Sequence, residues 1–293
     1  MKKRVLFVIF VGVSIINCQS IDFRGEPEIF APGIISIENS EVKITFSKDG
    51  EIVLWGSIGR ENGVGGFDIW QAERNENGWS NPQPASFNSL ENDFDPCFSA
   101  DGKTIYFFSN RPGGFGKDDI YYASYDSATY TFGVPVNMGA EFNTPGDEWG
   151  PSVSTDGSKF IYCTDGIKGK GEHDIFVSER TLEGWSLPMA IDNINSEADD
   201  FDPVFLHDSK TILFTRKQSE DVALLYISYL SKNGYSTPVL INSKMNIPDT
   251  WNFGSSIDFS DESYLYYSTY IEENSRGRLD IYRIKYSLSV INE

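Results

Sequence analysis

The chain has 293 residues, of which 40% are hydrophobic and 14% aromatic, and its formal net charge is −19 at pH 7. This composition can bury a substantial core, which excludes a disordered, collagenous or coiled-coil chain. The strong negative charge repels phosphate backbones, so we expect no nucleic-acid partner.

The N-terminus has the pattern of a secretory signal. Lys2, Lys3 and Arg4 form a basic start, and residues 5–16 are an apolar run that is too short to span a bilayer. Residues 1–17 are therefore predicted to be a signal peptide that is removed on export.

The apolar run ends at Ile15-Ile16-Asn17-Cys18, which resembles the lipobox of bacterial lipoproteins. The resemblance implies that Cys18 is lipidated and becomes the first residue of the mature chain, and an ordinary cleaved signal is the alternative. Several acyl chains on one residue give an anchoring that a single chain cannot give. Because Gln19 rather than Asp follows Cys18, the resemblance favours the outer membrane, on its periplasmic side or at the cell surface. Residues 18–25 are expected to be a linker, and the anchor is expected to be the only membrane contact.

A short motif recurs five times along the rest of the chain. Its central acidic position falls at residues 49, 101, 156, 208 and 261, so that the steps are 52, 55, 52 and 53 residues. Such regular spacing indicates a repeat architecture.

Each repeat has the signals of a four-stranded sheet. Two short apolar runs flank the motif, which is Asp-Gly in three repeats, and this pattern predicts a hairpin with a tight turn. A third run, rich in β-branched and aromatic residues, begins with Asp-Ile in four repeats, at Asp68, Asp119, Asp174 and Asp280. A fourth segment contains a Pro, which is tolerated at the edge of a sheet. We predict a propeller blade for each repeat, and a structural role for the recurring Asp of the third strand.

The two ends of the chain complement each other. The fifth repeat lacks its fourth segment, whereas residues 27–30 supply a spare one ahead of the first hairpin. We therefore predict an all-β fold, a five-bladed β-propeller of four-stranded antiparallel blades, in which the N-terminal strand closes the last blade. Residues 26–293 are expected to form a single propeller domain.

The second repeat carries a resemblance to a known family. Residues 95–107, Asp-Pro-Cys-Phe-Ser-Ala-Asp-Gly-Lys-Thr-Ile-Tyr-Phe, are followed by Ser109-Asn110-Arg111-Pro112 and by Asp119-Ile120-Tyr121. This order is similar to the WD-like propeller repeat of TolB and related periplasmic proteins, and the resemblance covers essentially the whole mature chain. In TolB the propeller has six blades and follows an α/β domain, and in other relatives it precedes a peptidoglycan-binding domain. We expect neither extra domain here, so Tol-system and cell-wall functions are not carried over.

Acidic residues recur where the innermost strand of a blade begins. Four of the five equivalent positions hold a carboxylate, namely Glu41, Asp93, Glu148 and Asp200. The following position is aromatic in three repeats, at Phe94, Trp149 and Phe201. Because innermost strands surround the central channel, these acids with Trp149 and Trp251 are a candidate site at the channel mouth for a cation, a basic peptide or a sugar. The alternative is that the acids accept backbone N–H bonds in the turns between blades.

We interpret the chain as a non-enzymatic cell-envelope binding or scaffold lipoprotein that recognises a protein, peptide or other ligand at the channel mouth. The alternative is a carbohydrate-active enzyme or carbohydrate-binding protein that uses the channel carboxylates and Trp residues, because paired carboxylates can hydrolyse glycosides. The Trp-x-Asn-Asp-Pro type of motif of five-bladed arabinanases and fructosidases is not found in the sequence, so no catalytic residue is predicted. The chain is expected to be a monomer.

Residues for cofactor chemistry are few. The two histidines, His173 and His207, are expected at the surface and are too few for a histidine-based metal site or a Ser-His-Asp triad. The clusters 91–93 and 197–200 are possible calcium ligands but lack the spacing of a calcium loop. No metal or cofactor is predicted. Cys97 and Cys163 lie in apolar strands, and burial as small apolar residues is favoured over a disulfide.

Overall fold

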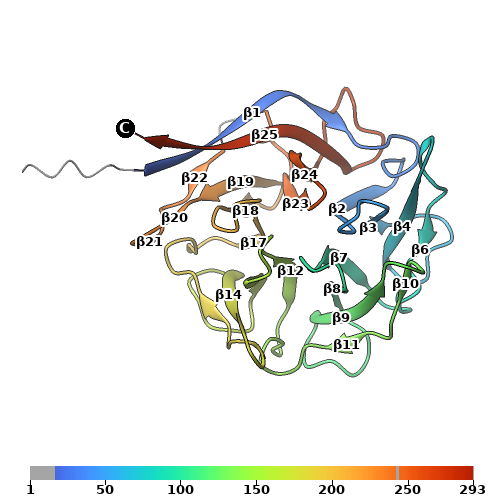
Figure 1. Cartoon of the computed structure of the whole chain (residues 1–293), viewed down its shortest axis with the longest axis horizontal. Helices are drawn as coiled ribbons and strands as arrows, with labels where there is room; N and C mark the ends of the chain where they lie inside the picture. Colours follow the sequence, from blue (N-terminus) through green and yellow to red (C-terminus); the bar gives the residue numbers. More distant parts are fainter. Residues whose placement is uncertain (1–16, 242–243, 293) are drawn as a thin grey trace, which may run out of the picture.

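The computed structural model describes residues 17–241 and 244–292, and this part of the chain is folded entirely from β-strands and their connections (Figure 1). The predicted signal peptide lies, except for its last residue, outside the described residues. No helix within the described ranges is long and apolar enough to cross a membrane.

Five antiparallel sheets are arranged around a common axis, which confirms the predicted five-bladed propeller (Figure 1). The first blade contains β2 (Ser40–Phe46), β3 (Ile52–Ile58), β4 (Phe67–Asn75), β5 (Gly78–Trp79) and β6 (Gln83–Pro84). The second contains β7 (Asp93–Phe98), β8 (Thr104–Ser109), β9 (Asp119–Asp126), β10 (Thr131–Phe132) and β11 (Val136–Asn137). The third contains β12 (Glu148–Val153), β13 (Lys159–Thr164), β14 (Asp174–Thr181), β15 (Gly184–Trp185) and β16 (Met189–Ala190).

The last two blades complete the ring. The fourth contains β17 (Asp200–Phe205), β18 (Ile212–Ser219), β19 (Val222–Ser228) and β22 (Val239–Leu240), beside the small hairpin β20 (Leu230–Ser231) and β21 (Gly234–Tyr235). The fifth contains β23 (Phe253–Asp258), β24 (Asp261–Thr269), β25 (Asp280–Asn292) and β1 (Asn17–Ile29). The outermost strand is short in the first four blades, as expected for segments that contain Pro at an edge.

The Asp-Gly motif forms the turn of the first hairpin in the first three blades. Gly50, Gly102 and Gly157 have φ angles of +74°, +72° and +70°, which an L-residue with a Cβ adopts at a cost. In the first of these turns the Ser47 hydroxyl donates to Asp49 at 2.6 Å, and the other two turns contain the same Ser-to-Asp bond. The turn chemistry therefore sets the length of the two inner strands and their register.

The apolar core lies between neighbouring blades. Leu54 and Ile69 of the first blade pack with Phe98 and Phe107 of the second, and all four side chains are fully buried. Equivalent clusters fill the other interfaces, so that most of the hydrophobic stabilisation comes from contacts between sheets. Cys97 and Cys163 are both buried and unbridged, as predicted.

The recurring Asp of the third strand fixes the loop that precedes it. Asp119 accepts the backbone N–H groups of Phe115 and Gly116, and Asp68, Asp174 and Asp280 accept two N–H groups at the same offsets. A Cβ on Gly116 would lie 2.2 Å from the Thr144 carbonyl oxygen of the next blade. These loops therefore join adjacent blades, and the structural role predicted for this Asp is confirmed.

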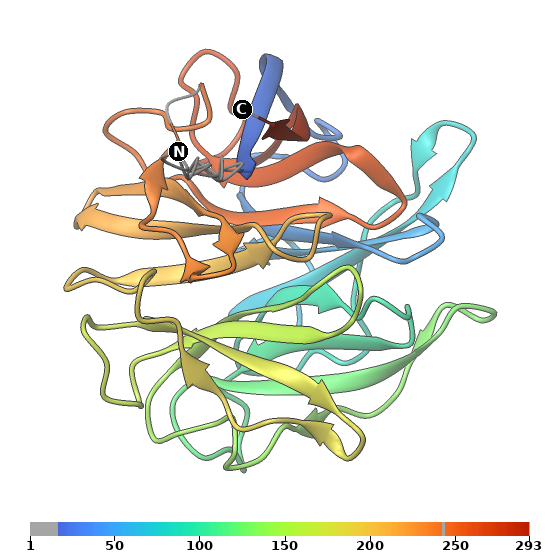
Figure 2. The same ribbon diagram turned by 60° about the vertical axis from the view of Figure 1, so that its left-hand side comes forward.

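The N-terminal strand closes the ring. Ile29 pairs with Tyr282 and the Phe30 N–H donates to the Ile281 carbonyl at 2.7 Å, so β1 is the outer strand of the last blade. Both views place β1 beside β25 (Figures 1 and 2). The predicted closure is confirmed.

The segment expected to be a linker is also part of this strand. Residues 18–24 pair in antiparallel register with residues 285–291. Ile21 and Phe23 supply the reason, because their side chains pack against the apolar cluster of the last two blades. The linker assignment of residues 18–25 is therefore corrected to strand for most of its length.

Closure of the ring by β1 is tested by truncation. A chain that starts at residue 30 should melt about 10 °C or more below one that starts at residue 17, because β25 loses its partner strand and its apolar cover. The bare edge should also cause self-association. Circular dichroism melting and size-exclusion chromatography of the two chains measure both effects. Equal melting temperatures would show that closure does not depend on this strand.

Candidate binding site at the propeller axis

The four acids predicted for the channel mouth are fully buried. Glu148 accepts the backbone N–H of Thr144 at 2.9 Å, four residues earlier, and Glu41, Asp93 and Asp200 make the same bond to Ile37, Ser89 and Ser196. Each carboxylate therefore holds the loop that leads into an innermost strand. They do not line an opening, and their geometry is that of the alternative interpretation, in which the acids accept backbone N–H bonds.

The blades compensate these buried carboxylates in two ways. Asp93 forms an ion pair with Arg111, just after β8, and Asp200 forms one with Arg216 of β18, whereas Glu148 accepts the Thr164 hydroxyl at 2.6 Å. Burial raises the pKa of Glu41 and of Glu148 to about 7, and it also raises the pKa of Asp200, where the bond from Arg216 opposes the rise. In the clusters considered as calcium ligands, Asp93 and Asp200 thus hold an arginine side chain.

An aromatic funnel, with a cavity of about 280 Å³, opens at the axis. Trp149 and Trp251 both line it, so the structure brings together these two residues of the predicted site without the four acids. The funnel also contains Phe94 and Phe201, whose positions follow two of those acids. The full lining is Phe67, Asn92, Phe94, Asp95, Phe108, Asp118, Trp149, Asp199, Phe201, Asp202, Trp251 and Phe253.

At the axis, the innermost strands adopt a backbone conformation that most residues avoid. A bulge in each strand gives one residue a φ angle between +45° and +61°, at Lys43, Asp95, Gly150, Asp202 and Gly254. A Cβ on Gly150 would lie 2.9 Å from the Asp202 Cα, which shows how closely the strands approach here. Bulges of this kind bend the strands away from one another at the point of convergence.

Charged side chains of these bulges form a buried network beside the funnel. Asp202 accepts the Gly254 N–H at 3.0 Å, and Lys43 Nζ donates to the Ser255 carbonyl at 3.0 Å. Burial raises the pKa of Asp95 well above its usual range, the nearby Asp202 carboxylate raises it further, and burial also raises the pKa of Asp202. The charge of Lys43 opposes the rise of both pKa values.

Two further carboxylates support the funnel wall. Trp149 Nε1 donates to Asp118 Oδ2 at 2.7 Å, and the indole stacks on the His173 ring at a centroid distance of 4.0 Å. His173 in turn contacts Asp199 through Nδ1 at 2.8 Å. Burial raises the pKa of Asp118, and the bond from Trp149 opposes this rise. The wall thus combines an aromatic face with anchored acidic groups.

The sequence analysis missed several of these residues. Phe67, Asp118 and His173 occupy one repeated position, immediately before the Asp of the third strand. This recurrence was the signal that could have placed them around one opening. His173 was expected at the surface, but it is 6% exposed because it lies beneath Trp149.

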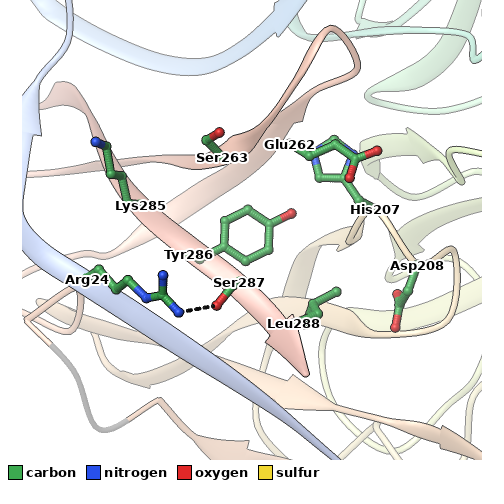
Figure 3. Close-up of a pocket in the computed structure, with 9 residues that line it drawn as sticks. All are labelled: Arg24, His207, Asp208, Glu262, Ser263, Lys285, Tyr286, Ser287 and Leu288. Atoms are coloured by element: carbon green, nitrogen blue, oxygen red, sulfur yellow. Dashed lines mark hydrogen bonds between the residues drawn. The ribbon is translucent and has the colours of Figure 1, made fainter. Parts of the chain in front are cut away.

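A second hollow lies at the rim, beside the paired terminal strands (Figure 3). It has a volume of about 590 Å³ and is lined by side chains of both charges, including Arg24, Lys285 and Glu262. Arg24 donates to the Ser287 hydroxyl at 3.2 Å. His207 lines this hollow and stacks on Tyr286. Because this hollow mixes charges and is lined by few rings, those of Tyr286 and His207, it is less suited to a specific ligand than the funnel.

Comparisons with known proteins agree on the fold. No protein-family model matches the chain, and no curated protein matches it by sequence. Among solved structures, a putative TolB from Agrobacterium tumefaciens is similar over 87% of this chain and 91% of its own, with 13% identity and a TM-score of 0.52. An α-L-arabinofuranosidase from Podospora anserina is similar over 87% of this chain and 92% of its own, with 13% identity and a TM-score of 0.54.

The chain spans 55% of the length of TolB from Acinetobacter baumannii, which is 14% identical over 84% of this chain, with a TM-score of 0.49. At 13% identity, the two structures with TM-scores of 0.52 and 0.54 show a shared fold alone. The funnel of this chain must therefore be interpreted from its own residues.

The buried glutamates predict a pH dependence of stability. Glu148 is protonated in the folded state between its ordinary pKa of 4.5 and about 7, whereas the unfolded chain releases this proton. The contribution of Glu148 to the free energy of unfolding is therefore complete below about pH 4.5 and is lost as the pH rises to 7. Between pH 5 and pH 8, Glu148→Gln should remove about 1–3 kcal/mol of the pH-dependent change in unfolding free energy.

Urea unfolding of wild type and Glu148→Gln at both pH values measures this difference, and Glu41 contributes equally to both proteins. Glu183→Gln, at an exposed turn, is the matched control and should follow the wild type. The interpretation fails if the profile of Glu148→Gln is parallel to that of the wild type.

Proposed function

We propose that the chain is a non-enzymatic binding module that takes a basic side chain of a protein or peptide into the axial funnel. The observation that carries the proposal is the convergence of seven aromatic rings with Asp118 and Asp199 around one opening. Aromatic faces next to carboxylates attract a Lys or Arg side chain through cation–π and ionic interactions. The net charge of −19 adds a long-range attraction for a basic partner.

The size of the funnel favours a side chain over a larger ligand. Its volume of about 280 Å³ lies just below the range of small-molecule sites, which is roughly 300–1,000 Å³. One or two side chains of a peptide fill such a space. The rest of the partner would then contact the loops around the opening.

The second candidate is a carbohydrate ligand, since sugars also stack on Trp149 and Trp251. The arabinofuranosidase with the same architecture supports this candidate as far as fold alone can. Hydrolysis needs two carboxyl groups about 5–9 Å apart. Asp118 and Asp199, the acids of the funnel wall, are each bonded to a ring nitrogen, of Trp149 and of His173, and this use of both carboxylates supports binding over catalysis.

We also propose that the protein is exported and anchored to the outer membrane through Cys18. The basic start, the short apolar run and the lipobox-like sequence before Cys18 support this location. Residue 18 belongs to β1, and β1 lies at the outer edge of the ring (Figure 1). The funnel is instead lined by residues in and beside the innermost strands. An anchor at the rim leaves the funnel open to a partner.

The funnel is tested with defined probes. Isothermal titration calorimetry should detect saturable binding of short Lys- or Arg-containing peptides, with an affinity that falls as the salt concentration rises. Trp251→Ala should weaken this binding about tenfold or more, because it removes one aromatic wall. Tyr122→Ala, an exposed aromatic of the second blade outside the funnel, is the control. Binding of oligosaccharides in place of peptides would favour the second candidate, and unchanged binding by Trp251→Ala would exclude the funnel as the site.

The anchor is tested by Cys18→Ser expressed in a bacterial host that lipidates its exported proteins. The variant should move from the membrane fraction to the soluble periplasmic fraction, because the residue that carries the acyl chains is lost. Cys97→Ser controls for the loss of a thiol. Continued membrane retention of Cys18→Ser would contradict lipidation at this residue.

A further inference from the structure

Three potential metal ligands converge on the third blade, behind the funnel wall. Asp147 precedes β12, Asp165 follows β13 and His173 precedes β14. One ligand atom from each of these residues lies within 4.8 Å of the other two. The topology thus brings together residues that are up to 26 positions apart in the sequence.

Each of the two carboxylates uses its Oδ1 for a backbone N–H group, which leaves its Oδ2 for a charged partner. Asp165 Oδ1 accepts the Asp147 N–H at 2.7 Å, and Asp147 Oδ1 accepts the Asp118 N–H at 3.2 Å. The two Oδ2 atoms both face Lys117 Nζ, at 2.9 and 3.4 Å. A cation therefore already occupies the space between them. The Lys117 side chain is 65% exposed, so it can leave this position without breaking a packed core.

The imidazole of His173 has a free nitrogen. Its Nδ1 carries the proton, because its partner, the Asp199 carboxylate at 2.8 Å, accepts. The side chain is only 7% exposed, and its Nε2 is buried and has no hydrogen-bond partner among the described residues. A buried nitrogen without a partner is costly. A histidine that binds a metal usually donates its other N–H to a carboxylate, as His173 does here.

The second blade shows that the fold does not need these negative charges. Asn92 and Asn110 hold the positions of Asp147 and Asp165, and the Asn92 N–H donates to Asn110 Oδ1 at 2.9 Å. Asn92 Oδ1 likewise accepts the Phe67 N–H, as Asp147 accepts that of Asp118. An amide oxygen therefore satisfies the backbone at both positions. The carboxylates of the third blade add charge that these loops do not require.

We propose that Asp147, Asp165 and His173 bind a divalent transition-metal ion, and that Lys117 holds the place of this ion when it is absent. Two carboxylates and a neutral imidazole balance the charge of the ion. The nitrogen ligand favours zinc over calcium and magnesium, which prefer oxygen ligands. The proposal is independent of the proposed function, because the three ligands lie outside the funnel lining.

The test uses the full mature chain, without an affinity tag and dialysed against a chelator. Calorimetric titration should give one Zn²⁺ per chain, and Co²⁺ should give a visible absorption band. Asp165→Asn and His173→Gln should each weaken Zn²⁺ binding about 100-fold, and Asp199→Asn about 10-fold through the orientation of the imidazole. Asp165→Asn retains the amide oxygen that suffices in the second blade, so it should fold.

Lys117→Ala gives the most specific result. Because it removes the competing ammonium group, it should tighten Zn²⁺ binding about tenfold, whereas loss of a ligand would weaken it. His207→Gln changes the other histidine and should bind like the wild type. Unchanged affinity in both Asp165→Asn and His173→Gln would overturn the proposal. It would also be overturned if Lys117→Ala showed no saturable binding up to about 1 mM Zn²⁺.

Discussion

The pairing of β1 with β25 is the interaction on which the rest of the structure depends. Each blade has an apolar face that must be covered by its neighbour, so an open row of five sheets would leave two faces in water. The pairing of β1 with β25, which includes the pair Ile29–Tyr282, joins the two ends of the chain in one sheet. The first and last sheets then cover each other, and neither apolar face is left in water. Only in a closed ring do five innermost strands converge, and the funnel is a consequence of that convergence.

Convergence also explains where the acidic residues lie. Five strand starts and their loops meet in a small volume, and their backbone N–H groups need acceptors that no neighbouring strand can supply. Glu148 and its equivalents serve the loop before the first strand, and Asp119 and its equivalents serve the loop before the third. Part of the charge of −19 is thus internal and structural. Arginine or hydroxyl partners make this burial tolerable.

The architecture could be predicted from the sequence because a period of about 53 residues and a repeated turn motif are properties of the chain itself. The site was harder to predict because a strand sends successive side chains to opposite faces. Alignment of the repeats correctly located the start of each innermost strand, but Glu148 points back into its loop while Trp149, the next residue, faces the funnel. The proximity of Asp147, Asp165 and His173 depends on how three loops of one blade meet, which no spacing in the sequence records.

Trp149 connects the two proposed sites physically. One face of its indole borders the funnel, and His173 stacks against it at 4.0 Å, while Asp118 accepts from its Nε1 and donates its own N–H to Asp147. An ion held by Asp147 and His173 would fix the support of this wall. The same ion would reduce the negative potential that attracts a basic ligand. Since Lys117 already supplies one positive charge there, exchange of the ammonium group for a divalent ion changes the local charge by a single unit. Rigidity of the aromatic wall is therefore the larger of the two effects expected at the funnel.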